Sequence, residues 1–124
     1  IIVAQPLLAP KVPDNYSSAT KSWNTEPIKI ARDSASPECE INNSCYLPFA
    51  IKIDVDEEVT WRNEDSFSHT VTSGTSEDGP DGIFDSGSLR NSIYFSHIFS
   101  EAGIYDYYCT FHPWMKGVIA VGEI

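Results

Sequence analysis

A short run near the C-terminal end, residues 109–115 (CTFHPWM), brings together three side chains that bind soft metals. They are Cys109, His112 and Met115, in the order Cys-x2-His-x2-Met. A thiolate, an imidazole and a thioether together suit copper better than the other common biological metals. Zinc sites seldom contain a thioether, and magnesium and calcium prefer oxygen ligands. This run therefore predicts a copper centre.

One further imidazole would complete a trigonal plane of two histidines and one cysteine with a weak axial methionine. The chain has only three histidines, so the search is short. His69 begins a β-prone stretch 40 residues before Cys109, and only the tertiary fold can bring it close. His97 is in phase with Phe95 and Phe99, a pattern more typical of a packed histidine. We expect His69 to be the second imidazole and keep His97 as the alternative.

The three cysteines divide into a close pair and a distant one. Cys39 and Cys45 are separated by a short polar segment, which predicts a disulfide and leaves Cys109 as a free thiol. Disulfides are typical of exported proteins in oxidising compartments, so this pairing favours export.

A different pairing leads to a different fold. A Cys45–Cys109 disulfide with Trp61 between the cysteines, and Tyr107 two residues before the second, would be typical of an immunoglobulin domain with a recognition function. This alternative leaves Cys39 unpaired and the His-Pro-Trp-Met run unexplained. The two hypotheses differ in one observable, because the copper hypothesis forbids a disulfide at Cys109.

Alternation of apolar and polar residues indicates several short β-strands, and no segment has the periodicity of an amphipathic helix. Segment 33–44 is rich in turn-forming residues, and the Gly/Asp/Ser segment 74–87 is predicted as a loop. Short strands with frequent turns predict an all-β sandwich or barrel. The predicted strands are 26–32, 49–55, 59–63, 69–73, 93–99, 104–109 and 117–121.

With 124 residues, the chain has the size of one domain. Residues 1–25 show no periodicity and are predicted as an arm or linker before a folded domain at 26–124. The first ten residues are apolar but broken by proline, and we interpret them either as such an arm or as the remnant of a processed export signal or membrane tether. The net charge of −10 argues against nucleic-acid binding and is compatible with a basic partner.

Four motifs occur together and in order: 59–63, 69–72, 84–87 and 99–117. Together they resemble the cupredoxins, or type 1 copper proteins, and most of all the plastocyanin, amicyanin and pseudoazurin group with its small exported archaeal members. The resemblance covers residues 26–124 and implies a Greek-key β-sandwich with one copper ion per chain. The ligands that it implies are His69, Cys109, His112 and Met115.

The resemblance also implies a function and a cellular location. Such proteins carry single electrons between redox proteins by cycling between Cu(I) and Cu(II), and they are periplasmic or otherwise extracytoplasmic. It implies that the second histidine of the cluster lies near the surface, where apolar residues dock the partner; Phe111, Pro113 and Trp114 are the candidates. Asn63 and Thr110 are candidates to support the ligands by hydrogen bonds.

The ligand loop differs from the most familiar pattern in being short and in carrying the bulky Trp114 beside the axial ligand. If Met115 bound weakly or not at all, the copper would keep an open position. A mononuclear copper oxidoreductase that acts on small molecules such as nitrogen oxides is therefore the alternative to an electron carrier.

Overall fold

A computed structural model of the protein describes residues 20–21 and 26–122. Most of the predicted arm, residues 1–25, lies outside the described residues, and so does the predicted boundary with the folded domain. No helix within the described ranges is both long and apolar enough to span a bilayer.

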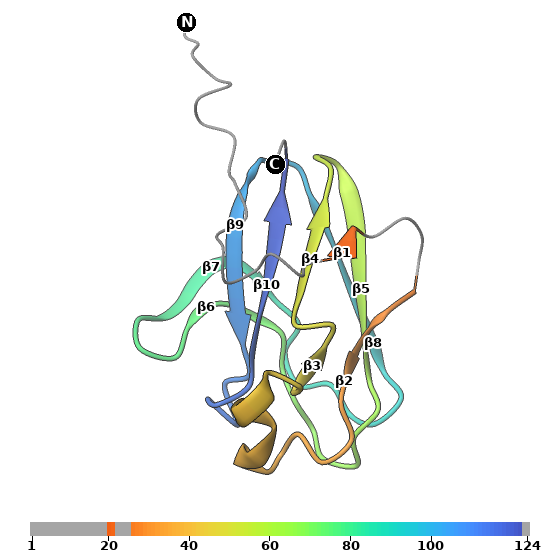
Figure 1. The fold of residues 1–124 in the computed structure, drawn as a ribbon, viewed down its shortest axis with the longest axis vertical. Coiled ribbons are helices and arrows are strands. Elements are labelled where there is room, and N and C mark those ends of the chain that lie inside the picture. Colours follow the sequence, from red (N-terminus) through yellow and green to blue (C-terminus); the bar gives the residue numbers. More distant parts are fainter. Residues whose placement is uncertain (1–19, 22–25, 123–124) are drawn as a thin grey trace, which may run out of the picture.

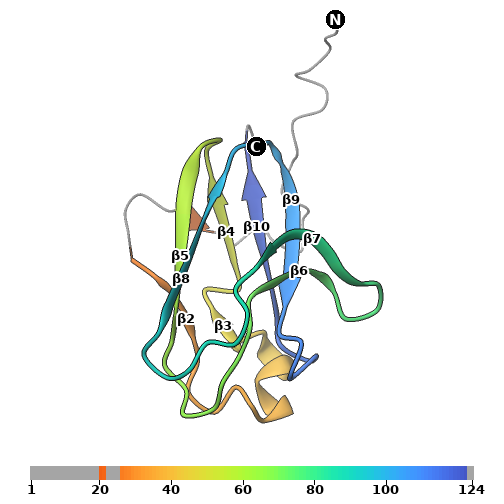
Figure 2. The ribbon, with the colours of Figure 1, turned by 180° about the vertical axis from the view of Figure 1, so that it is seen from behind.

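In the part of the chain that the structure describes, the strands form two sheets packed as a sandwich (Figures 1 and 2). The smaller sheet has the order β3 (Tyr46–Leu47), β2 (Ile28–Ile30), β5 (Glu57–Asn63) and β8 (Tyr94–Phe99). The larger sheet has the order β1 (Thr20–Lys21), β4 (Ala50–Ile53), β10 (Lys116–Val121), β9 (Gly103–Tyr108), β6 (Thr72–Thr75) and β7 (Gly79–Asp85). The chain crosses repeatedly from one sheet to the other, and the predicted all-β Greek-key sandwich is confirmed.

Strand β5 shows how the sequence pattern builds the core. Val59, Trp61 and Asn63 are buried, and the residues between them face outward, as the two-residue period of a strand requires. The Trp61 ring lies 5.3 Å from Tyr107 and 5.9 Å from Phe84, measured between ring centroids. Side chains from both sheets therefore interlock around one tryptophan.

Gly117 is required by this core packing. It lies opposite Tyr107 in the β9–β10 ladder, and a Cβ atom at this position would overlap the Tyr107 hydroxyl and ring. We expect Gly117→Ala to lower the free energy of unfolding by about 1–3 kcal/mol, because it overpacks a filled core. Urea unfolding measures the change. Gly103→Ala in the same strand pair is the control, since its new Cβ would approach Tyr105 only to 3.2 Å. Equal midpoints for the two variants would contradict this account.

The predicted loop 74–87 contains a strand. Residues 79–85 form β7, which pairs with β6 at the edge of the larger sheet, so the loop prediction is wrong there. Phe84 is the one buried position of β7, and the strand therefore lacks an alternating apolar pattern. In the turn-rich segment 33–44, residues 37–42 form a 3₁₀ helix, η3 (Pro37–Asn42).

The features that carry the metal-binding motifs meet at one end of the sandwich. Strand β9 runs toward this end and β10 returns from it, so their connection, residues 109–115, lies there (Figure 1). The connection between β5 and β6 and the helix η3 lie at the same end in both views (Figures 1 and 2). This end is opposite the one at which β10 finishes.

Candidate metal centre

Three of the predicted ligand side chains converge on one point. The Cys109 Sγ atom lies 3.7 Å from His69 Nδ1 and 3.7 Å from His112 Nδ1, and the two nitrogens are 3.1 Å apart. A triangle with these sides has a circumscribed radius of about 2.0 Å, close to typical metal–nitrogen and metal–sulfur bonds of about 2.0–2.3 Å. The donor set thus fits a single metal ion in its plane.

The loop between β9 and β10 positions Cys109 and His112 through its own backbone. The His112 N–H donates to the Cys109 carbonyl (3.3 Å), and the Met115 N–H donates to the His112 carbonyl (2.9 Å). The Cys109 N–H closes the loop by donating to the Met115 carbonyl (3.2 Å). The two-residue spacings in the sequence therefore correspond to two consecutive tight turns.

His69 is fixed from both sides of its backbone. It exchanges two hydrogen bonds with Leu89, His69 N–H to Leu89 O (3.1 Å) and Leu89 N–H to His69 O (2.8 Å). The Asn63 side-chain amide donates to the carbonyls of Phe67 and Leu89, both at 2.9 Å. Asn63, a predicted supporting residue, thus lies against the segment that carries His69.

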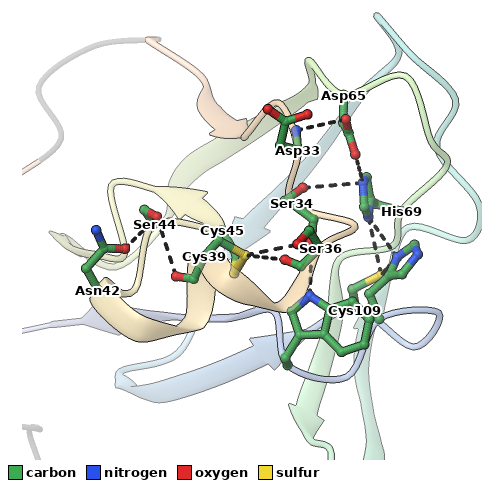
Figure 3. The surroundings of a disulfide bond; sticks show 12 residues. Asp33, Ser34, Ser36, Cys39, Asn42, Ser44, Cys45, Asp65, His69 and Cys109 are labelled. Carbon is green, nitrogen blue, oxygen red and sulfur yellow. Dashed lines mark hydrogen bonds and ion pairs between the residues drawn. A yellow bond between two sulfur atoms is a disulfide. The ribbon is translucent and has the colours of Figure 1, made fainter.

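The outward-facing side of the His69 ring contacts a buried carboxylate that the sequence analysis did not single out. His69 Nε2 lies 2.7 Å from Asp65 Oδ2 and 3.3 Å from Ser34 Oγ (Figure 3). The other Asp65 oxygen accepts the Asp33 N–H at 3.0 Å. A carboxylate that accepts a hydrogen bond from Nε2–H fixes the tautomer of a metal-binding histidine. The other ring nitrogen, Nδ1, is then unprotonated and can bind the metal.

The protonation states suit a metal site. Burial lowers the pKa of His69 below its usual value, although the hydrogen bond to Asp65 opposes this, so the imidazole is neutral as metal binding requires. Desolvation alone would raise the pKa of Asp65. Hydrogen bonds from His69 and from the backbone of Asp33 and Ser66 outweigh it and lower that pKa. An ionised, buried carboxylate therefore lies next to the neutral ring.

The sulfur of Cys109 is buried and has a backbone donor. The Thr70 N–H lies 3.3 Å from Cys109 Sγ, and Cys109 itself is fully buried. The Thr70 hydroxyl oxygen in turn accepts the Thr110 N–H at 2.9 Å. Hydrogen bonds to the cysteine sulfur and an apolar surround tune the potential of copper–thiolate sites. Thr110, the second predicted supporting residue, thus contacts Thr70, whose N–H faces the sulfur.

The remaining predicted positions differ in their surroundings. Met115 is fully buried in the apolar cluster that also contains Cys109. His97, the alternative ligand, lies on β8 with its ring centroid 4.9 Å from that of Phe84 and 4.7 Å from that of Phe99. It packs against aromatic rings and lies outside the cluster of donor atoms.

Of the three converging side chains, that of His112 lies nearest the surface. It is partly exposed, whereas His69 and Cys109 are fully buried. Its ring lies 5.4 Å from Trp114 and 6.5 Å from Phe111, and Phe111 is 51% exposed. Pro113 is also exposed. The partly exposed imidazole of His112 therefore has apolar neighbours at the surface.

All three cysteines belong to the described residues. The structure contains the predicted disulfide between Cys39 and Cys45 and leaves Cys109 as a buried thiol. This contradicts the Cys45–Cys109 disulfide of the immunoglobulin alternative, which is therefore wrong.

Comparison with known proteins gives a consistent result. Residues 35–122 match the family of copper binding proteins described as the plastocyanin/azurin family. Amicyanin-alpha from Methylorubrum extorquens is 32% identical over 84% of this chain and 88% of that protein. Amicyanin from Paracoccus versutus is 28% identical over 83% of this chain and 84% of that protein.

Solved structures agree. A structure described as a novel purple cupredoxin from Nitrosopumilus maritimus is 31% identical, has a TM-score of 0.68, and is matched over 83% of this chain and 99% of that one. A reduced Cu(I) form of an amicyanin variant is 25% identical with a TM-score of 0.59, over 81% of this chain and 84% of that one. Motif, fold and relatives lead to one conclusion: the chain belongs to the copper-binding plastocyanin/azurin family and is a cupredoxin.

Proposed function

We propose that this protein carries single electrons and that His69, Cys109 and His112 would hold its copper ion, with Met115 as a further, weaker ligand. The observation that carries the proposal is the triangle of two imidazole nitrogens and one sulfur. When bound, copper supplies the change between Cu(I) and Cu(II).

The protein's contribution is to keep the ligands still. Backbone hydrogen bonds from Leu89 and Thr70 and the Asp65 carboxylate hold His69 and Cys109 in place. Cu(I) and Cu(II) prefer different geometries, so ligands that cannot follow either preference keep the rearrangement between the two states small. This rigidity supports fast electron transfer.

The exposed side of the centre supports docking of a redox partner. Partly exposed His112, with Phe111 and Pro113 beside it, offers a small apolar contact area, as suits short-lived electron-transfer complexes. The net charge of −10 favours a partner with a basic face. The Cys39–Cys45 disulfide supports an exported, oxidising location.

Spectroscopy after addition of Cu(II) to the purified protein tests this function. We expect an intense thiolate-to-copper absorption in the visible region and reversible reduction to Cu(I) by voltammetry. Excess azide should leave the absorption and spin-resonance spectra unchanged, because the site is closed. An azide-induced change would favour the alternative, an open copper site acting on small molecules. Absence of the absorption would reject both.

A further inference from the structure

The segment 33–45, between β2 and β3, lies against the metal centre, and we call it the disulfide segment (Figure 3). It contains the turn at Asp33 and Ser34, the helix η3, and both cysteines of the disulfide. Ser34 is fully buried although it is polar. A buried serine in a segment that is mostly exposed or half-buried calls for hydrogen-bond partners, and these belong to the metal centre.

Ser34 contacts two parts of the centre at once. Its hydroxyl oxygen lies 3.3 Å from His69 Nε2, and its carbonyl accepts the Trp114 Nε1–H at 3.1 Å. The preceding N–H, of Asp33, donates to Asp65. Two consecutive residues thus support the imidazole of one ligand and the indole next to Met115.

The disulfide is well placed to hold Ser34 there. The Cys39 sulfur lies 3.7 Å from the Ser34 carbonyl oxygen and 3.5 Å from that of Ser36. None of the residues of η3 is fully buried, and Cys39 is the residue of this helix that packs against the core cluster. Cys45 is 1% exposed, and its carbonyl accepts the Ala31 N–H at 2.9 Å. The bridge therefore joins an exposed helix to the core beside Ser34.

We propose that the Cys39–Cys45 disulfide is a positioning element of the copper centre, acting through Ser34 on His69 and Trp114. A bridge that closes so short a loop restricts the unfolded chain only modestly, so global stabilisation is a poor account of it. Its location accounts for it better. The inference rests on the proposed assignment of His69 as a copper ligand.

A double-mutant cycle tests the proposal. The variants are Ser34→Ala, the pair Cys39→Ser/Cys45→Ser, and all three changes together, and Cu(II) affinity is measured by competition titration. We expect about tenfold weaker binding for Ser34→Ala and for the disulfide pair, as for other residues that support metal-binding histidines. If the bridge acts through Ser34, the combined variant is weakened about tenfold rather than a hundredfold.

Ser36→Ala is the matched control within the same segment, because the Ser36 side chain forms no capping bond with the described helix. We expect wild-type affinity for it. Wild-type affinity in the disulfide pair, or a hundredfold loss in the combined variant, would overturn the proposal. If the Cys39→Ser/Cys45→Ser variant does not fold, Ser34→Ala alone tests the proposal. Wild-type Cu(II) affinity in Ser34→Ala would also overturn it.

A second readout needs no copper. In the metal-free protein, hydrogen exchange of the Trp114 Nε1–H reports whether the Ser34 carbonyl still accepts it. We expect about tenfold faster exchange in the disulfide pair than in Ser36→Ala, because the acceptor is no longer held. Equal exchange rates would contradict the positioning role. Since this measurement is independent of electron transfer, the inference and the proposed function can fail separately.

Discussion

Cys109→Ser is expected to abolish the visible thiolate-to-copper absorption and to weaken Cu(II) binding at least a hundredfold. The sulfur is the anionic donor of the cluster, and a serine hydroxyl stays protonated and is a hard ligand. No other group can take the place of the sulfur as a metal ligand. Cys109 is fully buried, and the group next to its sulfur, the Thr70 N–H, is a hydrogen-bond donor that cannot bind a cation. Absorption titration with Cu(II) measures both effects.

Met115→Leu is the control for this experiment. Leucine has nearly the volume of methionine, so the change removes the thioether with little repacking of the core. The absorption should persist, since it belongs to the sulfur of Cys109, while the reduction potential should change if Met115 is the axial ligand. An intact absorption in Cys109→Ser would show that the thiolate does not bind copper and would end the assignment.

Asp65→Asn is expected to raise the reduction potential by at least about 60 mV, which is a tenfold loss of preference for Cu(II) over Cu(I). The Asp65 carboxylate is 2% exposed and 2.7 Å from the outer nitrogen of His69. A negative charge so close and so poorly solvated stabilises the more positive metal ion. Asparagine keeps the size of the side chain and one oxygen that can accept the Nε2–H, but its NH2 group replaces the oxygen that accepts the Asp33 N–H, so the charge and that one hydrogen bond change.

Glu64→Gln is the matched control for this charge effect. Glu64 precedes Asp65 in the same loop, and its carboxylate forms a partly exposed ion pair with Arg62 at 3.2 Å. The same loss of one negative charge occurs there in contact with water, which screens it. Redox titration should therefore show a small shift for Glu64→Gln. Equal shifts in the two variants would mean that the contact with His69 has no special effect.

The sequence was sufficient to locate the metal-binding motif because its spacing is local. Residues 109–115 form a closed loop, and the donor types alone indicate copper. His69 could be chosen over His97 because His97 is in phase with aromatic residues, and the structure packs it against Phe84 and Phe99. Alternation likewise identified the strands with one buried face, such as β5.

The residues around His69 could not be found in the same way. Asp65 lies in a polar stretch that is typical of an exposed loop, and its hydrogen-bond partner Asp33 is 32 residues away. Its position four residues before His69 was the one available signal. Ser34 has no recognisable signal in the sequence, because its partners His69 and Trp114 are 35 and 80 residues away. Strand β7 was missed because backbone pairing, rather than an apolar pattern, defines it.

The separation of His69 from Cys109 along the chain has a consequence for the lifetime of the protein. The two residues are 40 positions apart and meet in the folded sandwich. A metal ion that needs both side chains binds the folded chain and not the unfolded one, so metal binding adds to the resistance of the fold against unfolding. Copper supply would then govern how long the protein survives as well as whether it works.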